Sequence, residues 1–242
     1  MKATKMQGIR QGTRTGNAVD FWRKKGFQGS RSQLTCFAGI NGTVGSVTFP
    51  ILSTQQNNAN TVYGIEKRLN ISDSFIVLSC GIFLTSSAKQ ATNTSPTATE
   101  IASTTIRTFP NAATQVFDTK ADELENVYNG FLSIKIGNVN WFPSISMRTF
   151  YRVPQTQQSS ATTMDEYQRD QGIMKLTPTL TLNGNGNNDF TVTFASASVD
   201  MSASANTKFN GLLLYLDGII LPNAAGRVDL ETSNAFASQF GR

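Results

Sequence analysis

The sequence of 242 residues contains no histidine and only two cysteines. Without histidine the chain cannot build a Ser-His-Asp or Cys-His nucleophile system, and it lacks the side chain that usually acts as a base near neutral pH. Two cysteines are too few for a thiolate zinc site or a disulfide framework. We therefore expect a protein that is not an enzyme, with no catalytic, cofactor-binding or metal-binding residues and no cofactor.

The motifs that resemble chemical sites are better interpreted as structure. Cys36 and Cys80 lie in apolar strand-like runs, where a free cysteine behaves as a small buried hydrophobe; a single bridge between them is the alternative. Residues 39–45 are glycine-rich but lack the Gly-Lys-Ser/Thr ending of a phosphate loop. Residues 183–189 hold one carboxylate, Asp189, and lack the glutamate at the twelfth position of a calcium loop, so we expect a connecting turn there.

Charged residues are scarce, at 15% of the chain, and unevenly placed. Residues 1–35 hold eight basic residues and one acidic residue, a balance of +7, whereas the remainder holds 13 basic and 15 acidic residues, a balance of −2. Uncharged polar residues take their place, which suits either a protein that packs against many neighbours or an ordinary secreted β-sandwich. No apolar run marks a signal peptide, and the longest one, 75–84, is too short to span a bilayer.

Residues 1–32 are predicted to be a basic flexible arm, because glycines interrupt them and no hydrophobic period is sustained. Within the arm, 18–25 is expected to form a short helix. Its aromatic pair beside three cations suits an anionic lipid surface or a nucleic-acid backbone; alternatively, the pair tucks under a neighbouring subunit. The predicted contact residues are Lys2, Lys5, Arg10, Arg14, Phe21, Trp22, Arg23, Lys24, Lys25 and Arg31.

The stretch from Tyr128 to Pro154 predicts a long β-hairpin. Apolar and mixed residues alternate over 131–136, so that one face of the strand is apolar. Gly137-Asn138 fits a tight turn with glycine at the position where φ is positive. A second alternating run, 145–153, is expected to form the return strand, which ends at a proline that lacks the N–H donor.

Two further hairpins are expected at Asn41-Gly42 and at Asp217-Gly218, both of which are strong turn dipeptides. Residues 74–84 are apolar on both faces, which is typical of a central strand buried between two layers. Short helices are expected at 118–128 and within the polar stretch 155–171.

Successive strands without a βαβ alternation indicate an all-β protein, a sandwich or jelly roll with two short connecting helices. The length fits one barrel or two tightly packed barrels. We expect four regions: the basic arm 1–32, a β jelly-roll part 33–158, a polar helical connection 159–172, and a second β part with the C-terminal tail, 173–242.

The run 124–158, especially Tyr128–Ile136 and Phe150–Gln158, together with Gly211–Leu216, resembles virion proteins of phages that infect Bacteroidetes-type bacteria. Among these it is most similar to jelly-roll capsid proteins of small tailless phages with an internal membrane. The resemblance implies a viral-capsid-type β-sandwich or barrel that assembles, as trimers, into an icosahedral shell. The basic arm 1–32 would face the internal membrane or the genome.

The same resemblance implies the partners and the location. The partners would be other copies of the chain, other virion proteins, and anionic lipid headgroups or packaged nucleic acid bound through the arm. The protein would reside in the virion after synthesis in the host bacterial cytoplasm. The alternative function is a carbohydrate-binding or adhesin-type β-sandwich module with an aromatic binding patch. A single-stranded nucleic-acid-binding protein would instead carry basic and aromatic residues on its strands.

Overall fold

The computed structural model of the protein describes residues 14–40, 43–54, 66–88, 105–107, 123–151, 172–196, 199–200, 208–228 and 230–240. The strands are β1 (Ser30–Gly39), β2 (Thr43–Val44), β3 (Ser46–Phe49), β4 (Ser74–Ala88), β5 (Thr105–Arg107), β6 (Phe131–Ile136), β7 (Val139–Ser146), β8 (Ile173–Asn183), β9 (Asn188–Thr193), β10 (Val199–Asp200) and β11 (Lys208–Leu221). The helices are α1 (Arg14–Lys24), α3 (Glu123–Tyr128), the 3-10 turn η1 (Met147–Phe150) and α4 (Leu230–Phe240).

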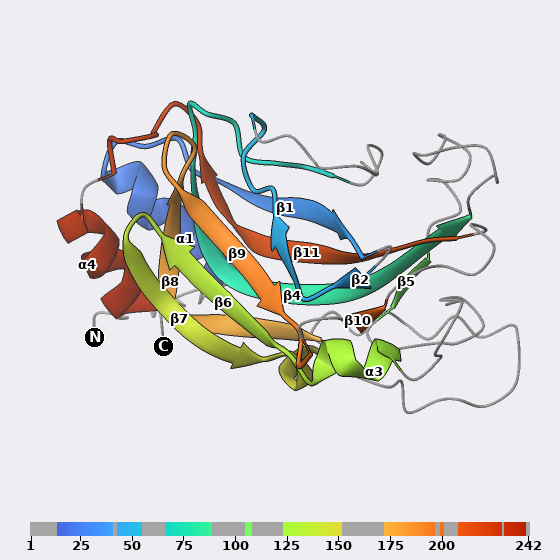
Figure 1. The fold of residues 1–242 in the computed structure, drawn as a ribbon. Helices are drawn as coiled ribbons and strands as arrows, with labels where there is room; N and C mark the ends of the chain where they lie inside the picture. The colour runs from blue at the N-terminus through green and yellow to red at the C-terminus, as the bar shows by residue number, and fades with distance from the viewer. Residues whose placement is uncertain are drawn as a thin grey trace, which may run out of the picture.

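These strands build two facing sheets, and all their ladders are antiparallel (Figure 1). The first sheet has the order β1-β11-β4, and β8 and β5 both pair with the remaining side of β4. The second sheet has the order β3-β9-β6-β7. The short strands β2 and β10 form a separate pair. The prediction of an all-β protein is confirmed.

The strand pairs are nested along the chain. β6 pairs with β7, and outside this innermost hairpin β4 pairs with β8, β3 with β9 and β1 with β11. Strands that follow residue 173 therefore complete both sheets begun by strands before residue 158. The described strands do not form two packed barrels, because strands from both parts, 33–158 and 173–242, pair within the same two sheets. Residues 159–171 of the expected connection lie outside the described residues.

The main core lies between the two sheets and is made of alternate residues of their facing strands. Phe75 of the first sheet and Phe49 and Phe190 of the second are fully buried there. The alternation predicted for β6 is confirmed, since Leu132 and Ile134 are fully buried and the residues between them are not. Full burial of each such side chain stabilises the fold by about 1.5–3 kcal/mol.

The predicted central strand is β4, which is buried on both faces. Its register against both neighbours shifts between Val77 and Ser79, where β4 has one extra residue relative to β11. Because side chains alternate along a strand, the extra residue changes which parity faces inward. Phe75 precedes the shift and Cys80 follows it, and both lie in the main core. Leu78, at the shift, packs on the opposite face of the sheet.

The hairpin predicted at Asp217-Gly218 is wrong, because β11 runs through these residues without turning. Two ladders hold the strand straight here, with β1 on one side and β4 on the other. Ile219 and Leu221 beyond the dipeptide are fully buried. Pairing on both sides and burial of these side chains outweigh the local turn preference.

The hairpin predicted at Asn41-Gly42 is also wrong, although these two residues lie outside the described residues. The strands that would form it belong to different sheets: β1 pairs with β11, and β3 pairs with β9. The chain therefore crosses from one layer to the other between them. Leu34 and Phe49 reach the core from opposite sides, which a simple hairpin would not allow.

The central hairpin is confirmed at its turn and corrected at its end. Gly137 joins β6 to β7 with a φ of +59°. The alternation predicted for residues 145–153 stops at Ser146, because η1 follows instead of more strand. Met147 and Phe150 are both fully buried, and the spacing of three that a 3-10 turn provides puts both side chains toward the core.

The alanine substitution at Gly218 is expected to destabilise the protein. The added methyl group would clash with the carbonyl oxygen of Ile76 in the neighbouring strand. Such overpacking costs about 1–3 kcal/mol. In urea denaturation, Gly218→Ala should lose at least this much, whereas Gly186→Ala, whose nearest neighbours would lie 3.4 Å from the methyl carbon, should change stability little. Equal stability of the two variants would contradict the straight course of β11.

Candidate interaction surfaces

Helices α1 and α4 cover one end of the outer face of the first sheet (Figure 1). Trp22 is fully buried among Ile76, Ile219 and Phe236 of strands and helix. Its ring centroid lies 5.2 Å from that of Phe236 and 5.7 Å from that of Phe27. The helices α1 and α4 are therefore held together by an aromatic cluster.

The prediction of a flexible arm over residues 1–32 is wrong from residue 14 onward, since α1 and the start of β1 occupy this part. Trp22 was expected to contact a partner but is buried inside its own chain, and Phe21 is partly buried against Phe236. These rings pack into an apolar site within the chain. Residues 1–13, with Lys2, Lys5 and Arg10, lie outside the described residues, and the side chain of Arg14 does too.

The remaining predicted residues reach the surface, where α1 ends and β1 begins. Arg23, Lys24 and Lys25 are exposed at the C-terminal end of α1, which a helix dipole favours for cations. Arg23 lies 3.8 Å from Asp20, and both side chains are 64% exposed, so this pair contributes little to stability. Arg31 extends from β1 and lies 3.3 Å from Asp217 of β11.

Next to these cations lies a groove of about 560 Å³. Gly26, with a φ of +85°, ends α1 and lets the chain turn toward β1. Gly29 then packs against Ile219 and Leu221, where a side chain would be crowded. The groove is lined by Arg23, Gly26, Phe27, Gln28, Gly29, Ser30 and Pro222. Of its lining residues, Arg23 alone was predicted as a contact residue, because the groove combines two distant segments of the chain.

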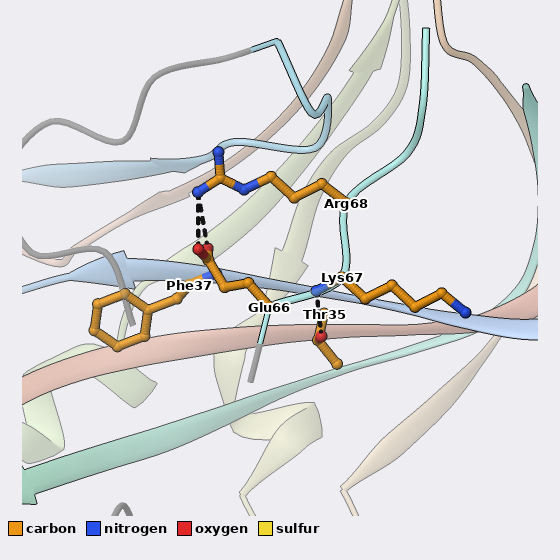
Figure 2. Close-up of polar contacts among 5 residues, drawn as sticks. All are labelled: Thr35, Phe37, Glu66, Lys67 and Arg68. Atoms are coloured by element: carbon orange, nitrogen blue, oxygen red, sulfur yellow. Dashed lines mark hydrogen bonds and ion pairs between the residues drawn. The ribbon is translucent and has the colours of Figure 1, made fainter. Parts of the chain in front are cut away.

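The outer edge of β1 is closed by the segment Glu66–Arg68 (Figure 2). Lys67 exchanges backbone hydrogen bonds of 2.8 and 2.9 Å with Thr35. The Glu66 carboxylate accepts the backbone N–H of Phe37 at 2.8 Å and the Arg68 guanidinium at 2.9 and 3.1 Å. The side chains of Glu66 and Arg68 are only 6% and 13% exposed. The segment therefore occupies the edge of β1 at Thr35 and Phe37, which hinders addition of another strand there.

The opposite type of edge is found at the hairpin β6–β7. Phe131, Val139 and Trp141 are 49%, 54% and 37% exposed, and they make up most of the large exposed hydrophobic side chains of the described residues. Among the described strands, β7 pairs only with β6 and is therefore an edge strand. Its register shifts and Pro143 interrupt the regular row of donors, so we expect side-chain contacts here rather than addition of a strand.

The cysteines are structural. Both thiols are free and buried, so the alternative of a bridge between them is ruled out. Burial raises the pKa of Cys36 and of Cys80 to about 12, which leaves neither thiol reactive near neutral pH. Within the described ranges, no cluster of acidic and cysteine side chains could hold a metal ion, and no helix is long and apolar enough to cross a bilayer.

No protein-family model matches this chain, and neither does any curated protein. A functional assignment therefore depends on the three surfaces described above. They are the basic groove at the end of α1, the closed edge of β1 and the apolar edge at β6–β7.

Replacing Trp22 by alanine is expected to cost about 3–5 kcal/mol in urea denaturation, because it empties the cluster between α1 and α4. Trp22→Phe is the matched control. It keeps an aromatic ring and removes an indole N–H that has no hydrogen-bond partner, so its cost should be much smaller. If Trp22→Ala left stability unchanged while weakening binding to lipid or nucleic acid, the original prediction of a contact residue would be restored.

Replacing Glu66 by glutamine keeps an acceptor for Phe37 but leaves the buried Arg68 guanidinium without its counter-charge. We expect a loss on the order of 3 kcal/mol in chemical denaturation. The double variant Glu66→Gln/Arg68→Met should recover part of this loss.

The control for this prediction is Asp217→Asn, which breaks the more exposed pair with Arg31 and should cost less than about 1 kcal/mol. Similar costs for Glu66→Gln and Asp217→Asn would contradict a special role for the buried pair. Opening the edge of β1 should also increase aggregation of Glu66→Gln, measured by light scattering.

Proposed function

We propose that this protein is a virion structural protein, a capsid subunit with a single jelly roll that self-assembles, as trimers, into an icosahedral shell. The observation that carries the proposal is the nested strand order. If the eight strands of the two main sheets other than β5 are counted along the chain, the first pairs with the last, the second with the seventh, the third with the sixth and the fourth with the fifth. Two Greek keys wound together in this way make a jelly roll, the architecture of many capsid domains.

The two sheet edges support assembly by contacts between unlike surfaces. The edge of β1 is closed by Glu66 and Arg68, whereas the hairpin β6–β7 presents Val139 and Trp141. A surface that is not its own complement makes head-to-tail contacts, and such contacts close into rings when the rotation permits. A trimer is the ring proposed here, with the side chains of β6–β7 packing against a neighbouring copy.

The distribution of charge supports an orientation for the subunit. The body beyond residue 35 is close to neutral, with a balance of −2, which limits repulsion between packed copies. Three exposed cations, Arg23, Lys24 and Lys25, lie at the end of the sandwich where α1 and α4 lie. In the proposed virion this end faces inward, toward the internal membrane or the genome, and other virion proteins contact the shell. Synthesis takes place in the host bacterial cytoplasm.

A second candidate function is a carbohydrate-binding or adhesin-type module, since lectins also use jelly rolls. The observation that favours it is the outer face of the second sheet. Thr48 and Thr191 share a hydrogen bond of 2.9 Å there, and Ser133 bonds to the backbone of Thr191. Phe131 stands exposed on the same sheet. This candidate predicts a monomer that binds glycans and loses binding in Phe131→Ala.

The proposed function is tested first by measuring the mass of the purified protein by light scattering across protein concentration and salt. Trimers or shell-sized particles are expected, with intact shells visible by electron microscopy. A strict monomer at high concentration and at all salt concentrations would contradict a capsid role and leave the glycan-binding candidate.

The proposed contact surface is tested by Val139→Ser/Trp141→Ser. This variant should raise the concentration needed for assembly about tenfold or more and leave the unfolding curve nearly unchanged, because both side chains are exposed in the isolated subunit. The matched control is Ile71→Ser/Ile106→Ser, which removes two equally exposed side chains from other parts of the surface. Equal weakening by the two variants would contradict a contact at β6–β7.

A further inference from the structure

The groove between α1 and β1 has the size of a ligand site. Its volume of about 560 Å³ falls within the range of roughly 300–1,000 Å³ found for small-molecule pockets. Gly26 and Gly29 form part of its surface, so a ligand can approach the backbone closely. Phe27 forms one wall and is fixed from behind by the ring of Trp22.

The polar groups around the groove are rich in hydrogen-bond donors. Arg23 and the exposed residues Gln28 and Ser30 line it directly. In the described part of the chain, neither the backbone amide nor the side-chain amide of Gln28 makes a hydrogen bond. Arg227 lies beside the groove: its guanidinium carbon is 5.9 Å from the ring centroid of Phe27, and one of its nitrogens donates to the carbonyl of Asn223.

The positive charge around the groove favours the binding of an anion. Arg23 and Arg227 are not the only cations here: the exposed Lys24 and Lys25 follow Arg23 directly at the end of α1. Among the described residues, Asp20 lies 3.8 Å from Arg23 and is largely exposed, and the Asp73 carboxylate accepts the backbone N–H of Asn223 nearby. Two guanidinium groups beside neutral donors suit the oxygens of a phosphate group, because each guanidinium offers a planar fork of N–H donors.

The surroundings of the groove favour nucleic acid over lipid as the source of the phosphate. A helix that lies in a membrane interface is held there by apolar side chains that enter it, in addition to the attraction between its cations and anionic lipids. Trp22 is fully buried, Phe21 and Phe27 are partly buried, and the large exposed hydrophobic side chains of the described residues lie elsewhere. Binding of nucleic acid through phosphates needs cations and donors only, and it does not depend on base sequence.

We propose that this groove binds a phosphodiester group of single-stranded nucleic acid, with Arg23 and Arg227 as its charged contacts. Gln28 and Ser30 donate hydrogen bonds to the same group, and Phe27 packs against the attached sugar or base. The inference rests on the proposed function for the identity of the natural ligand, the packaged genome. The donors, volume and charge that make the site are independent of assembly.

The test uses the full chain and a fluorescent oligothymidine, which forms no stable duplex, in an anisotropy titration. The double variant Arg23→Gln/Arg227→Gln should bind at least about fivefold more weakly. The slope of log Kd against log salt should fall by about 0.7 for each lost contact. Asp20→Asn removes the competing carboxylate and should tighten binding about twofold. Basic residues before Arg14 are present in every variant, so they cannot account for the difference.

The matched control is Arg148→Gln/Lys175→Gln, which removes the same charge from exposed positions on other elements and should change Kd less than twofold. Equal weakening by the two double variants would overturn the inference, since only net charge would then matter. Groove-dependent binding of phosphatidylglycerol vesicles without binding of oligothymidine would also overturn it, in favour of a lipid headgroup.

Light scattering on the same preparations separates this inference from the proposed function. If the protein stays monomeric but binds oligothymidine through Arg23 and Arg227, the groove is supported and the capsid role is contradicted. If it forms shells and binds oligothymidine equally well with and without these residues, the capsid role is supported and the groove is contradicted.

Discussion

The antiparallel ladder between β4 and β11 is the contact on which the rest of the fold depends. Each strand also pairs on its other side, β11 with β1 and β4 with β8 and β5. Both faces of the ladder are buried, one against the second sheet and the other partly beneath α1 and α4. The extra residue of β4 between Val77 and Ser79 reverses which side chains face the second sheet, so that Cys80 lies in the main core together with Phe75. Without the extra residue, the core residues after Ser79 would point to the outer layer.

The edge strands of the two sheets differ in what covers them. β1 is sealed by a buried ion pair, which excludes unwanted strand addition, and one end of the first sheet lies beneath two helices. The hairpin β6–β7 keeps apolar side chains in solvent, where a partner can bury them. Because the protein has few charges, its surfaces differ mainly in shape and polarity and less in electrostatic potential.

The features that could be predicted from the sequence are those that depend on nearby residues. The turn at Gly137, the alternation of β6 and the two apolar faces of β4 are encoded within single segments. The wrong hairpin at Asp217-Gly218 shows the limit, because the partner that keeps β11 straight is β1, at the other end of the chain. The jelly roll and the capsid role remain predictions.

The candidate surfaces were predicted only in part, for the same reason. The cations of α1 were recognisable from composition, but the burial of Trp22 depends on Phe236. The groove likewise needs Pro222 to complete it. Glu66 gave no signal, because its role is to accept a backbone N–H from a strand 29 residues away. Neither periodicity nor motif spacing encodes such contacts.

The nested strand order also determines when the molecule can fold. Arg31 of β1 and Asp217 of β11, whose side chains form an ion pair across the ladder, are separated by 186 residues. At synthesis rates of about 5–20 residues per second, β1 waits roughly 10–40 seconds for its partner strand. Contacts of such long range also make folding slow. Until the last strand and α4 emerge, Trp22 has no complete pocket and the groove has no second wall. A chain whose synthesis stops early therefore lacks both the closed first sheet and the surface that α1 forms with the C-terminal part of the chain.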